Sequence, residues 1–129
     1  YMKRKFTEEL FIHAEDGDAE AQYLLAGCYD QGSGIDQNAQ KAAFWFSKSA
    51  EQGNSSAQFM LGTFYQCGRG VEKNLEKAIE LYTKAAKQHN LNAYYKLKEL
   101  HCDEILKDIP TSISLEELRA PRKRMEKEN

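Results

Sequence analysis

Few residues of this 129-residue chain are capable of nucleophilic, acid–base or metal chemistry. Such catalysis requires a base within hydrogen-bonding reach of a nucleophile, and a third group that orients the base. No serine, cysteine or paired carboxylate recurs around the three histidines, His13, His89 and His101. The densest group, His101-Cys102-Asp103, cannot converge on one metal, because adjacent residues on a helix point in different directions. We therefore expect no catalytic site, no metal and no cofactor.

The three cysteines, Cys28, Cys67 and Cys102, are odd in number and widely separated. Their spacing is not typical of a disulfide framework or of a metal-binding CxxC pair, and it favours a reducing compartment. We expect Cys28 to be a small core residue, and Cys67 less so. The sequence has no run approaching the roughly 20 apolar residues of a membrane span, and its basic start lacks the apolar core of a signal peptide. These features predict a cytoplasmic protein.

The charge of the chain gives little reason to expect a nucleic-acid or membrane partner. Eighteen basic and twenty acidic residues leave a formal net charge of −2, which is too balanced for attraction of the whole protein to a polyanion. Near the C-terminus, residues 122–128 carry charges of both signs. This run is open to contact with nucleic acid, but its composition favours a solvated chain end. We expect a protein or peptide partner.

Two glycine-rich segments are the remaining candidates for chemistry: Gln31-Gly32-Ser33-Gly34-Ile35 and Cys67-Gly68-Arg69-Gly70-Val71. A phosphate-binding loop runs from a strand into a helix N-terminus, usually with a lysine and a hydroxyl at fixed positions. Neither segment has that context. Two glycines permit a tight reversal, and the β-branched residue that follows can pack back under it. The segments are predicted to be turns between helices.

These turns belong to an internal repeat of about 36 residues. At that offset Gly17–Ala26 matches Gly53–Gly62, and the two glycine turns coincide. Further matches place Asn38, Lys41, Ala42, Trp45, Phe46, Lys48 and Ala50 on Asn74, Lys77, Ala78, Leu81, Tyr82, Lys84 and Ala86. The match continues past the second copy as a third half-repeat, and it precedes the first copy as another. Terminal half-units of this kind cap a stack.

Within one copy the apolar spacing is helical, so each unit is predicted to be two helices. Residues that can cap the helix starts recur at matching positions, namely Asp18, Asn54 and Asn90 for first helices and Asn38 and Asn74 for second helices. Gly17 and Gly53 follow the preceding helices, where a left-handed backbone suits glycine. His89 replaces this glycine in the last unit, so we expect a different turn there.

The repeated pattern of small residue, tyrosine, Gly-x-Gly-β-branched, Asn, Lys-Ala, aromatic pair and Ala resembles the Sel1-like repeat, a relative of the tetratricopeptide repeat. The resemblance covers about Thr7 to Leu100. It implies an all-α fold, a right-handed α-solenoid of antiparallel helix pairs whose first helices line a concave, partner-binding surface. It also implies an adaptor or scaffold. Members of this family that are as small as this chain are mostly bacterial. The chain lacks the paired cysteines of some secreted members, and this disfavours a periplasmic location.

The repeat predicts a single domain over residues 1–129. We divide it into an N-terminal capping helix (3–16), repeat 1 (17–52), repeat 2 (53–88), a half-repeat (89–106), and a C-terminal cap with a charged tail (107–129). Ser114-Leu115-Glu116-Glu117 resembles a capping box that begins a short last helix.

The candidate partner-binding residues are those on the first helices that do not face the paired helix. An aromatic residue recurs among them, and rigid aromatic anchors are typical of binding surfaces. The alternative is that these rings pack between adjacent units. The full concave-face set is Glu20, Tyr23, Asp30, Gln31, Phe59, Thr63, Gln66, Asn92, Tyr95 and Glu99.

Phe44 is a second candidate, on the outer face. Its counterpart in the second copy is Glu80, and a position that accepts glutamate faces solvent. Beside Trp45 and Phe46 it would enlarge an apolar patch and mark a second interface or a homodimer contact, unless the N-terminal helix covers it through Phe6 and Leu10.

The sequence thus predicts a protein–protein interaction module, an adaptor or scaffold that holds a peptide or protein on its concave face. The alternative function is a dedicated inhibitor, such as an immunity protein that binds and blocks a bacterial toxin.

Overall fold

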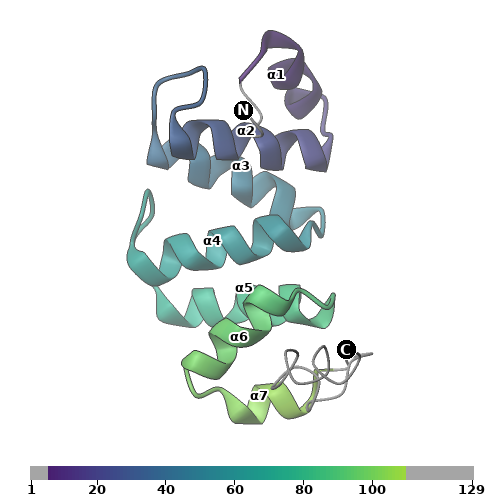
Figure 1. Ribbon diagram of the computed structural model, residues 1–129, viewed down its shortest axis with the longest axis vertical. Coiled ribbons are helices and arrows are strands. Elements are labelled where there is room, and N and C mark those ends of the chain that lie inside the picture. Colours follow the sequence, from purple (N-terminus) through teal and green to yellow (C-terminus); the bar gives the residue numbers. More distant parts are fainter. Residues whose placement is uncertain (1–5, 110–129) are drawn as a thin grey trace, which may run out of the picture.

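The structure, a computed structural model, describes residues 6–109. Within this range the chain forms seven α-helices and no strand (Figure 1). The helices are α1 (Glu8–Glu15), α2 (Ala19–Gln31), α3 (Ala39–Glu51), α4 (Ser55–Cys67), α5 (Leu75–Lys87), α6 (Leu91–Glu99) and α7 (Asp103–Lys107). The predicted all-α class is confirmed.

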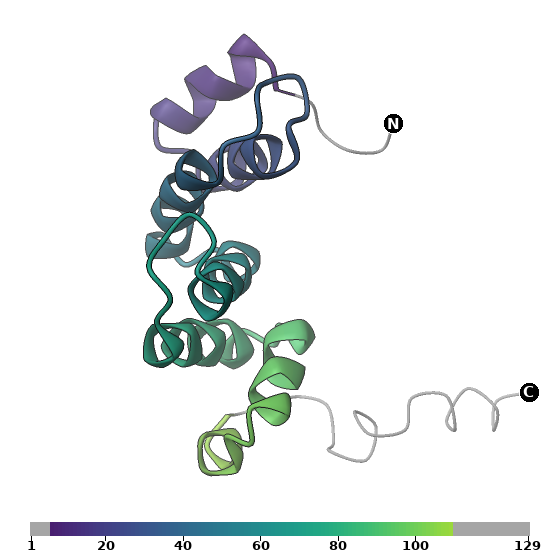
Figure 2. The same ribbon diagram turned by 90° about the vertical axis from the view of Figure 1, so that its left-hand side faces the viewer.

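The helices stack as antiparallel pairs in two columns (Figures 1 and 2). Helices α2, α4 and α6 form one column, and α1, α3 and α5 form the other. The pairs α2–α3 and α4–α5 have the most extensive contacts, and α3 packs on α4 to join one unit to the next. Each unit therefore buries its apolar face against its sequence neighbours, as in a solenoid.

All five predicted Asp and Asn caps are confirmed. The side chain of each accepts a hydrogen bond from the backbone N–H three residues later, at 2.9–3.0 Å. The bond satisfies one of the N–H groups that have no partner inside the helix. Because these caps depend on residues adjacent in sequence, they define the start of each long helix locally.

The two glycine-rich segments form matching turns, as predicted. Gly32 and Gly68 end α2 and α4 in the left-handed conformation, at φ 70° and 74°. Ile35 and Val71, which follow, pack against the core. Gly70 has no room for a side chain, because a Cβ there would overlap the backbone carbonyl of Ala39 in the preceding unit. The second turn therefore also sets how closely the units stack.

The expectation of a different turn at His89 is wrong. His89 adopts φ 70°, in the same left-handed region as Gly17 and Gly53. Its N–H donates to the carbonyl of Ala86, as the N–H of Gly53 does to Ala50. The hydrogen bonds and the N-cap on the following residue fix the turn strongly enough to hold a non-glycine residue in a conformation that it rarely adopts.

Two buried glutamines join successive units, in addition to apolar packing. Gln22 donates to the carbonyl of Ala14 at 3.0 Å and accepts from the side chain of Gln52 at 2.9 Å. One repeat later, Gln58 and Gln88 form the same arrangement, with Gln88 donating to Gln58 at 3.0 Å. The core also contains Cys28, which is buried as predicted. These glutamine pairs satisfy carbonyls at the turns between units.

The ends of the stack are smaller than the central units. Helix α1 begins at Glu8, with Thr7 as its N-cap, so within the predicted segment 3–16 residues 6 and 7 precede the helix. The N–H of Phe6 donates to the carbonyl of Ser33 at 2.8 Å, which connects the chain before α1 to the first glycine turn. At the other end α7 has five residues. The predicted capping box at 114–117 and the charged tail lie outside the described residues.

Candidate functional site

All ten predicted concave-face residues lie on α2, α4 and α6, and we call the surface that they form the first-helix face. They differ in exposure. The exposed members are Glu20, Gln31, Asn92, Tyr95 and Glu99. The half-buried members are Tyr23, Asp30, Phe59, Thr63 and Gln66. The structure brings three of the ten, all from the first unit, around one groove, as described below, and distributes the others along the column.

The repeated aromatic position serves packing and surface at once. The ring of Tyr23 contacts that of Phe46 at a centroid distance of 5.8 Å, and the ring of Phe59 contacts that of Tyr82 at 5.9 Å. Each pair joins the two helices of one unit. Tyr95 instead contacts Tyr94 of its own helix and is 38% exposed. The first two rings are therefore partly structural, and the third is the most accessible.

The two units differ where the second helix meets the first. In the second unit the hydroxyl of Tyr82 donates to Oε1 of Gln66 at 2.6 Å and lies 3.4 Å from the hydroxyl of Thr63. Burial raises the pKa of Tyr82 above its ordinary value. In the first unit Phe46 and Gly27 stand at the matching positions, so neither a ring hydroxyl nor a threonine side chain occupies that space.

A groove of about 220 Å³ is present in the first unit, and we call it the Gly27 groove. Helix α2 contributes Tyr23, Leu24, Gly27, Asp30 and Gln31, α3 contributes Phe46, and α4 contributes Met60. Three of these residues, Tyr23, Asp30 and Gln31, belong to the predicted set, and Gly27 lies among them on α2. The walls are largely apolar, with polar groups at Asp30 and Gln31, a combination typical of small binding grooves.

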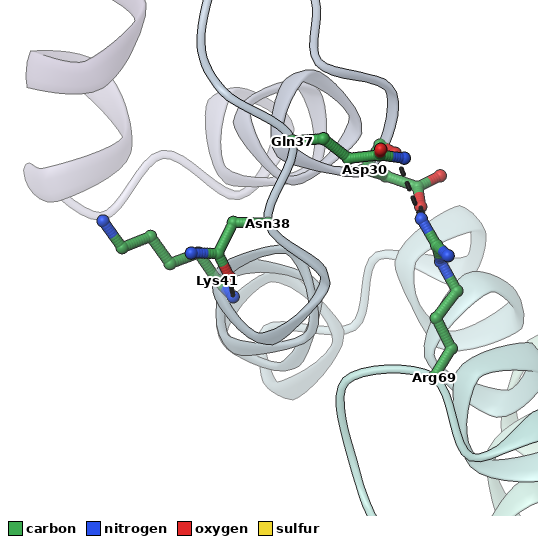
Figure 3. A network of polar contacts seen from close by, with 5 residues as sticks. All are labelled: Asp30, Gln37, Asn38, Lys41 and Arg69. Carbon is green, nitrogen blue, oxygen red and sulfur yellow. Dashed lines mark hydrogen bonds and ion pairs between the residues drawn. The ribbon is translucent and has the colours of Figure 1, made fainter.

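Asp30 does not offer a free charge to a partner. Arg69, in the turn between α4 and α5, donates from Nε and Nη2 to Oδ1 of Asp30 at 3.0 and 2.7 Å, and from Nη2 to its backbone carbonyl at 3.2 Å (Figure 3). Gln37 donates to the same carbonyl at 2.7 Å. This contact connects the turn of the second unit to the end of α2. It places an arginine beside the groove with its charge already paired.

A second groove, of about 230 Å³, lies between α1 and α2, and we call it the acidic groove. Its lining consists of Thr7, Glu9, Leu10 and His13 from the α1 side and Asp18, Glu20, Ala21 and Leu24 from the α2 side. Leu24 lines both grooves. The two grooves are therefore neighbours along α2. Glu20 belongs to the predicted set, and its carboxylate accepts a hydrogen bond from Asn54 at 3.4 Å.

Sequence reasoning missed Leu24, Met60 and Phe46 as groove residues. A signal for the first two was available, because an apolar residue follows the repeated aromatic in both full copies. From the sequence, Phe46 was named only in the repeat match and as a neighbour of Phe44 on the outer face. It is 1% exposed, yet its ring forms part of the groove wall. No pattern in a single helix reveals such a contribution, because it depends on the absence of a side chain at Gly27.

On the outer face, Phe44 is 52% exposed. Its ring contacts Trp45 edge-on at 5.1 Å, and Nζ of Lys48 lies 5.5 Å from its centroid. The N-terminal helix contacts Trp45 through Phe11 at 6.2 Å and leaves Phe44 accessible. Among residues 6–109 no three His, Cys, Asp or Glu side chains are grouped to hold a metal. The described helices include none with the length and apolar character needed to cross a membrane.

The repeat matches a known protein family. The family model for the Sel1 repeat matches residues 19–54 and 55–90. This chain belongs to the Sel1-repeat family. Sel1-repeat proteins generally mediate protein–protein interactions. A comparison with functionally curated proteins gave no significant match.

Solved structures of other Sel1-repeat proteins share the fold. A Sel1-repeat protein from Oxalobacter formigenes is 41% identical over 70% of this chain, with a TM-score of 0.70. A protective antigen with a Sel1-like repeat fold from uropathogenic Escherichia coli is 31% identical over 75% of this chain, with a TM-score of 0.71. The chain spans 26% and 21% of the lengths of these two proteins. The likeness confirms the predicted solenoid architecture.

Proposed function

We propose that this Sel1-repeat protein is a non-catalytic adaptor or scaffold that holds a peptide or protein partner on its first-helix face. The observation that supports the proposal is the Gly27 groove, which opens on that face between α2 and α4. Exposed polar residues and Tyr95 continue the face along the column. An apolar centre with a polar surround is the usual composition of a protein-binding surface.

The proposal includes a cytoplasmic setting, supported by the three cysteines, none of which forms a disulfide. It includes no role for nucleic acid or a membrane. The alternative function, a dedicated inhibitor, would use the same surface. Capture of a bacterial toxin as the partner would favour this alternative. We also keep Phe44 as a second contact, including contact with another copy of the chain.

The test replaces exposed residues only. Alanine at Tyr23 or Phe59 would remove rings that pack on Phe46 and Tyr82, and loss of binding would then be confused with loss of packing.

We therefore propose the variant Gln31→Ala/Asn92→Ala/Tyr95→Ala, with Glu80→Ala/Lys84→Ala on α5 as the matched control on the other column and Phe44→Ala as a separate variant. Partners captured from the source cell by each variant are compared with those of the unchanged protein. The triple variant is expected to lose the specific partner, with its thermal midpoint nearly unchanged, while the control retains it. The proposal is overturned if the triple variant captures the same partner at the same yield. Loss in Phe44→Ala alone would instead assign binding to Phe44.

A further inference from the structure

Gly27 is the feature of the groove that packing does not explain. It lies in the interior of α2. Glycine is less favourable than alanine in the interior of any helix. A Cβ at Gly27 would meet no atom within 4 Å, whereas one at Gly62, in α4, would lie 2.8 Å from the ring of Tyr82. Gly62 is thus required by packing. At Gly27 the fold accepts a poor helix former and leaves the space empty.

In the second unit, side chains fill the space that corresponds to the Gly27 groove. Thr63 replaces Gly27, and Tyr82 with its hydroxyl bond to Gln66 replaces Phe46. The first unit lacks both groups at once. The Gly27 groove is therefore a specific property of this unit and not a consequence of the repeat.

The charge around the groove indicates the kind of segment that fits it. Residues 1–54 contain nine Asp and Glu against five Lys and Arg, whereas residues 55–129 contain eleven Asp and Glu against thirteen Lys and Arg. Lys41 and Lys48 of the first part lie on α3, over the rings of Tyr29 and Phe44. Arg69, of the second part, is paired with Asp30.

The acidic groove adjoins the Gly27 groove through Leu24. Its lining includes Glu9, Asp18 and Glu20, with His13 as its one basic group. Asp18 also caps α2 by accepting from the N–H of Ala21, so Glu9 and Glu20 are the carboxylates best able to attract a partner. Complementary charge favours a positively charged ligand at such a rim.

We propose that the Gly27 groove binds one large apolar side chain of a positively charged peptide segment, and that a neighbouring lysine or arginine of this segment lies over Glu9 and Glu20. This inference rests on the proposed function and names the class of partner. The apolar side chain would lie against Leu24 and Met60, next to the buried ring of Phe46. Removal of this side chain and of the exposed parts of Leu24 and Met60 from water would favour binding. The basic residue would favour the orientation and the rate of association.

The probe is a set of twelve-residue peptides, selected from a random display library against the full chain and then synthesised with a fluorescent label. We expect the selected sequences to contain Lys or Arg beside a large apolar residue. Raising the salt concentration is expected to weaken their binding, because exposed charges are screened. Selection of acidic or uncharged peptides, or of none, would overturn the inference.

The decisive variant is Gly27→Leu, which fills the groove with a good helix former and removes no packed group. Its thermal midpoint is expected to equal or exceed that of the unchanged protein, while peptide affinity falls by at least about tenfold. Unchanged affinity in this stable variant would refute the groove as the site.

Charge is tested separately with Glu9→Lys/Glu20→Lys against the matched control Glu8→Lys/Glu76→Lys. All four glutamates are exposed and lie in the first turn of a helix, so both variants disturb the helix dipole alike. The first variant is expected to lose about tenfold in affinity and the control less than about twofold. Equal losses would overturn the role of Glu9 and Glu20.

The variants distinguish a failure of the groove inference from a failure of the proposed function. If peptide binding is insensitive to Gly27→Leu but is lost in Gln31→Ala/Asn92→Ala/Tyr95→Ala, the groove inference fails and the proposed function stands. If neither variant changes binding, both fail.

Discussion

Tyr82 and Phe46 occupy the same position in the two units, and the difference of one hydroxyl changes the surface above them. The Tyr82 hydroxyl bonds to Gln66 and is fully buried with its ring. Phe46 has no hydroxyl and is also buried, but it lines the Gly27 groove. The same position therefore packs in both units, and in the first unit it also lines a groove.

Replacing Tyr82 by phenylalanine is expected to reduce the free energy of unfolding by about 1 kcal/mol, because Gln66 loses its donor. The pH dependence also changes. Burial raises the pKa of Tyr82 in the folded protein above the ordinary value of 10.0. Its stabilising contribution is thus intact below pH 10 and is lost as the pH rises through the raised pKa.

Chemical denaturation between pH 8 and the alkaline limit of folding measures both effects. The unchanged protein is expected to lose stability more steeply above pH 10 than Tyr82→Phe. Parallel curves for the two proteins would show that Tyr82 does not cause the alkaline loss.

At the scale of elements, the sequence predicted what is encoded locally. The Asp and Asn caps and the glycine turns depend on residues a few positions apart, so their patterns identify them directly. His89 was misjudged because a glycine-type turn was assigned to glycine alone, although its hydrogen bonds and the Asn90 cap are the same as in the other turns. The glutamine pairs were not predicted. A glutamine in a helix looks like a surface residue, and its partners lie up to 30 positions away.

Gln58→Ala tests the importance of these pairs for the connection between units. Gln58 is 5% exposed, donates to the carbonyl of Ala50 and accepts from Gln88. Its loss leaves a buried carbonyl without this donor, so we expect the free energy of unfolding to fall by about 1–3 kcal/mol. The exposed Gln40→Ala on α3 is the control, with an expected change within about 0.5 kcal/mol. Equal effects in urea denaturation would show that the buried pair contributes nothing particular.

At the scale of the whole molecule, the two-column stack places α2, α4 and α6 in one column, so their residues lie along one side of the stack (Figure 2). The repeat period predicted a row of two-helix units, and the resemblance to the Sel1-like repeat implied their arrangement as a solenoid. The position of the grooves was not predictable in the same way. It depends on differences between the copies, such as Gly27 against Thr63, and on the shared wall at Leu24.

The central claim, that the first-helix face holds a protein partner, is tested most directly by photo-crosslinking in the source cell. A benzoylphenylalanine is placed at Gln31 or Asn92 on this face, and at Glu80 or Lys84 on the other column, one site per variant. All four positions are exposed, so the substitutions leave the core intact. We predict a specific protein adduct from Gln31 and Asn92 and none from the other two. Adducts from Glu80 or Lys84 alone would contradict the account.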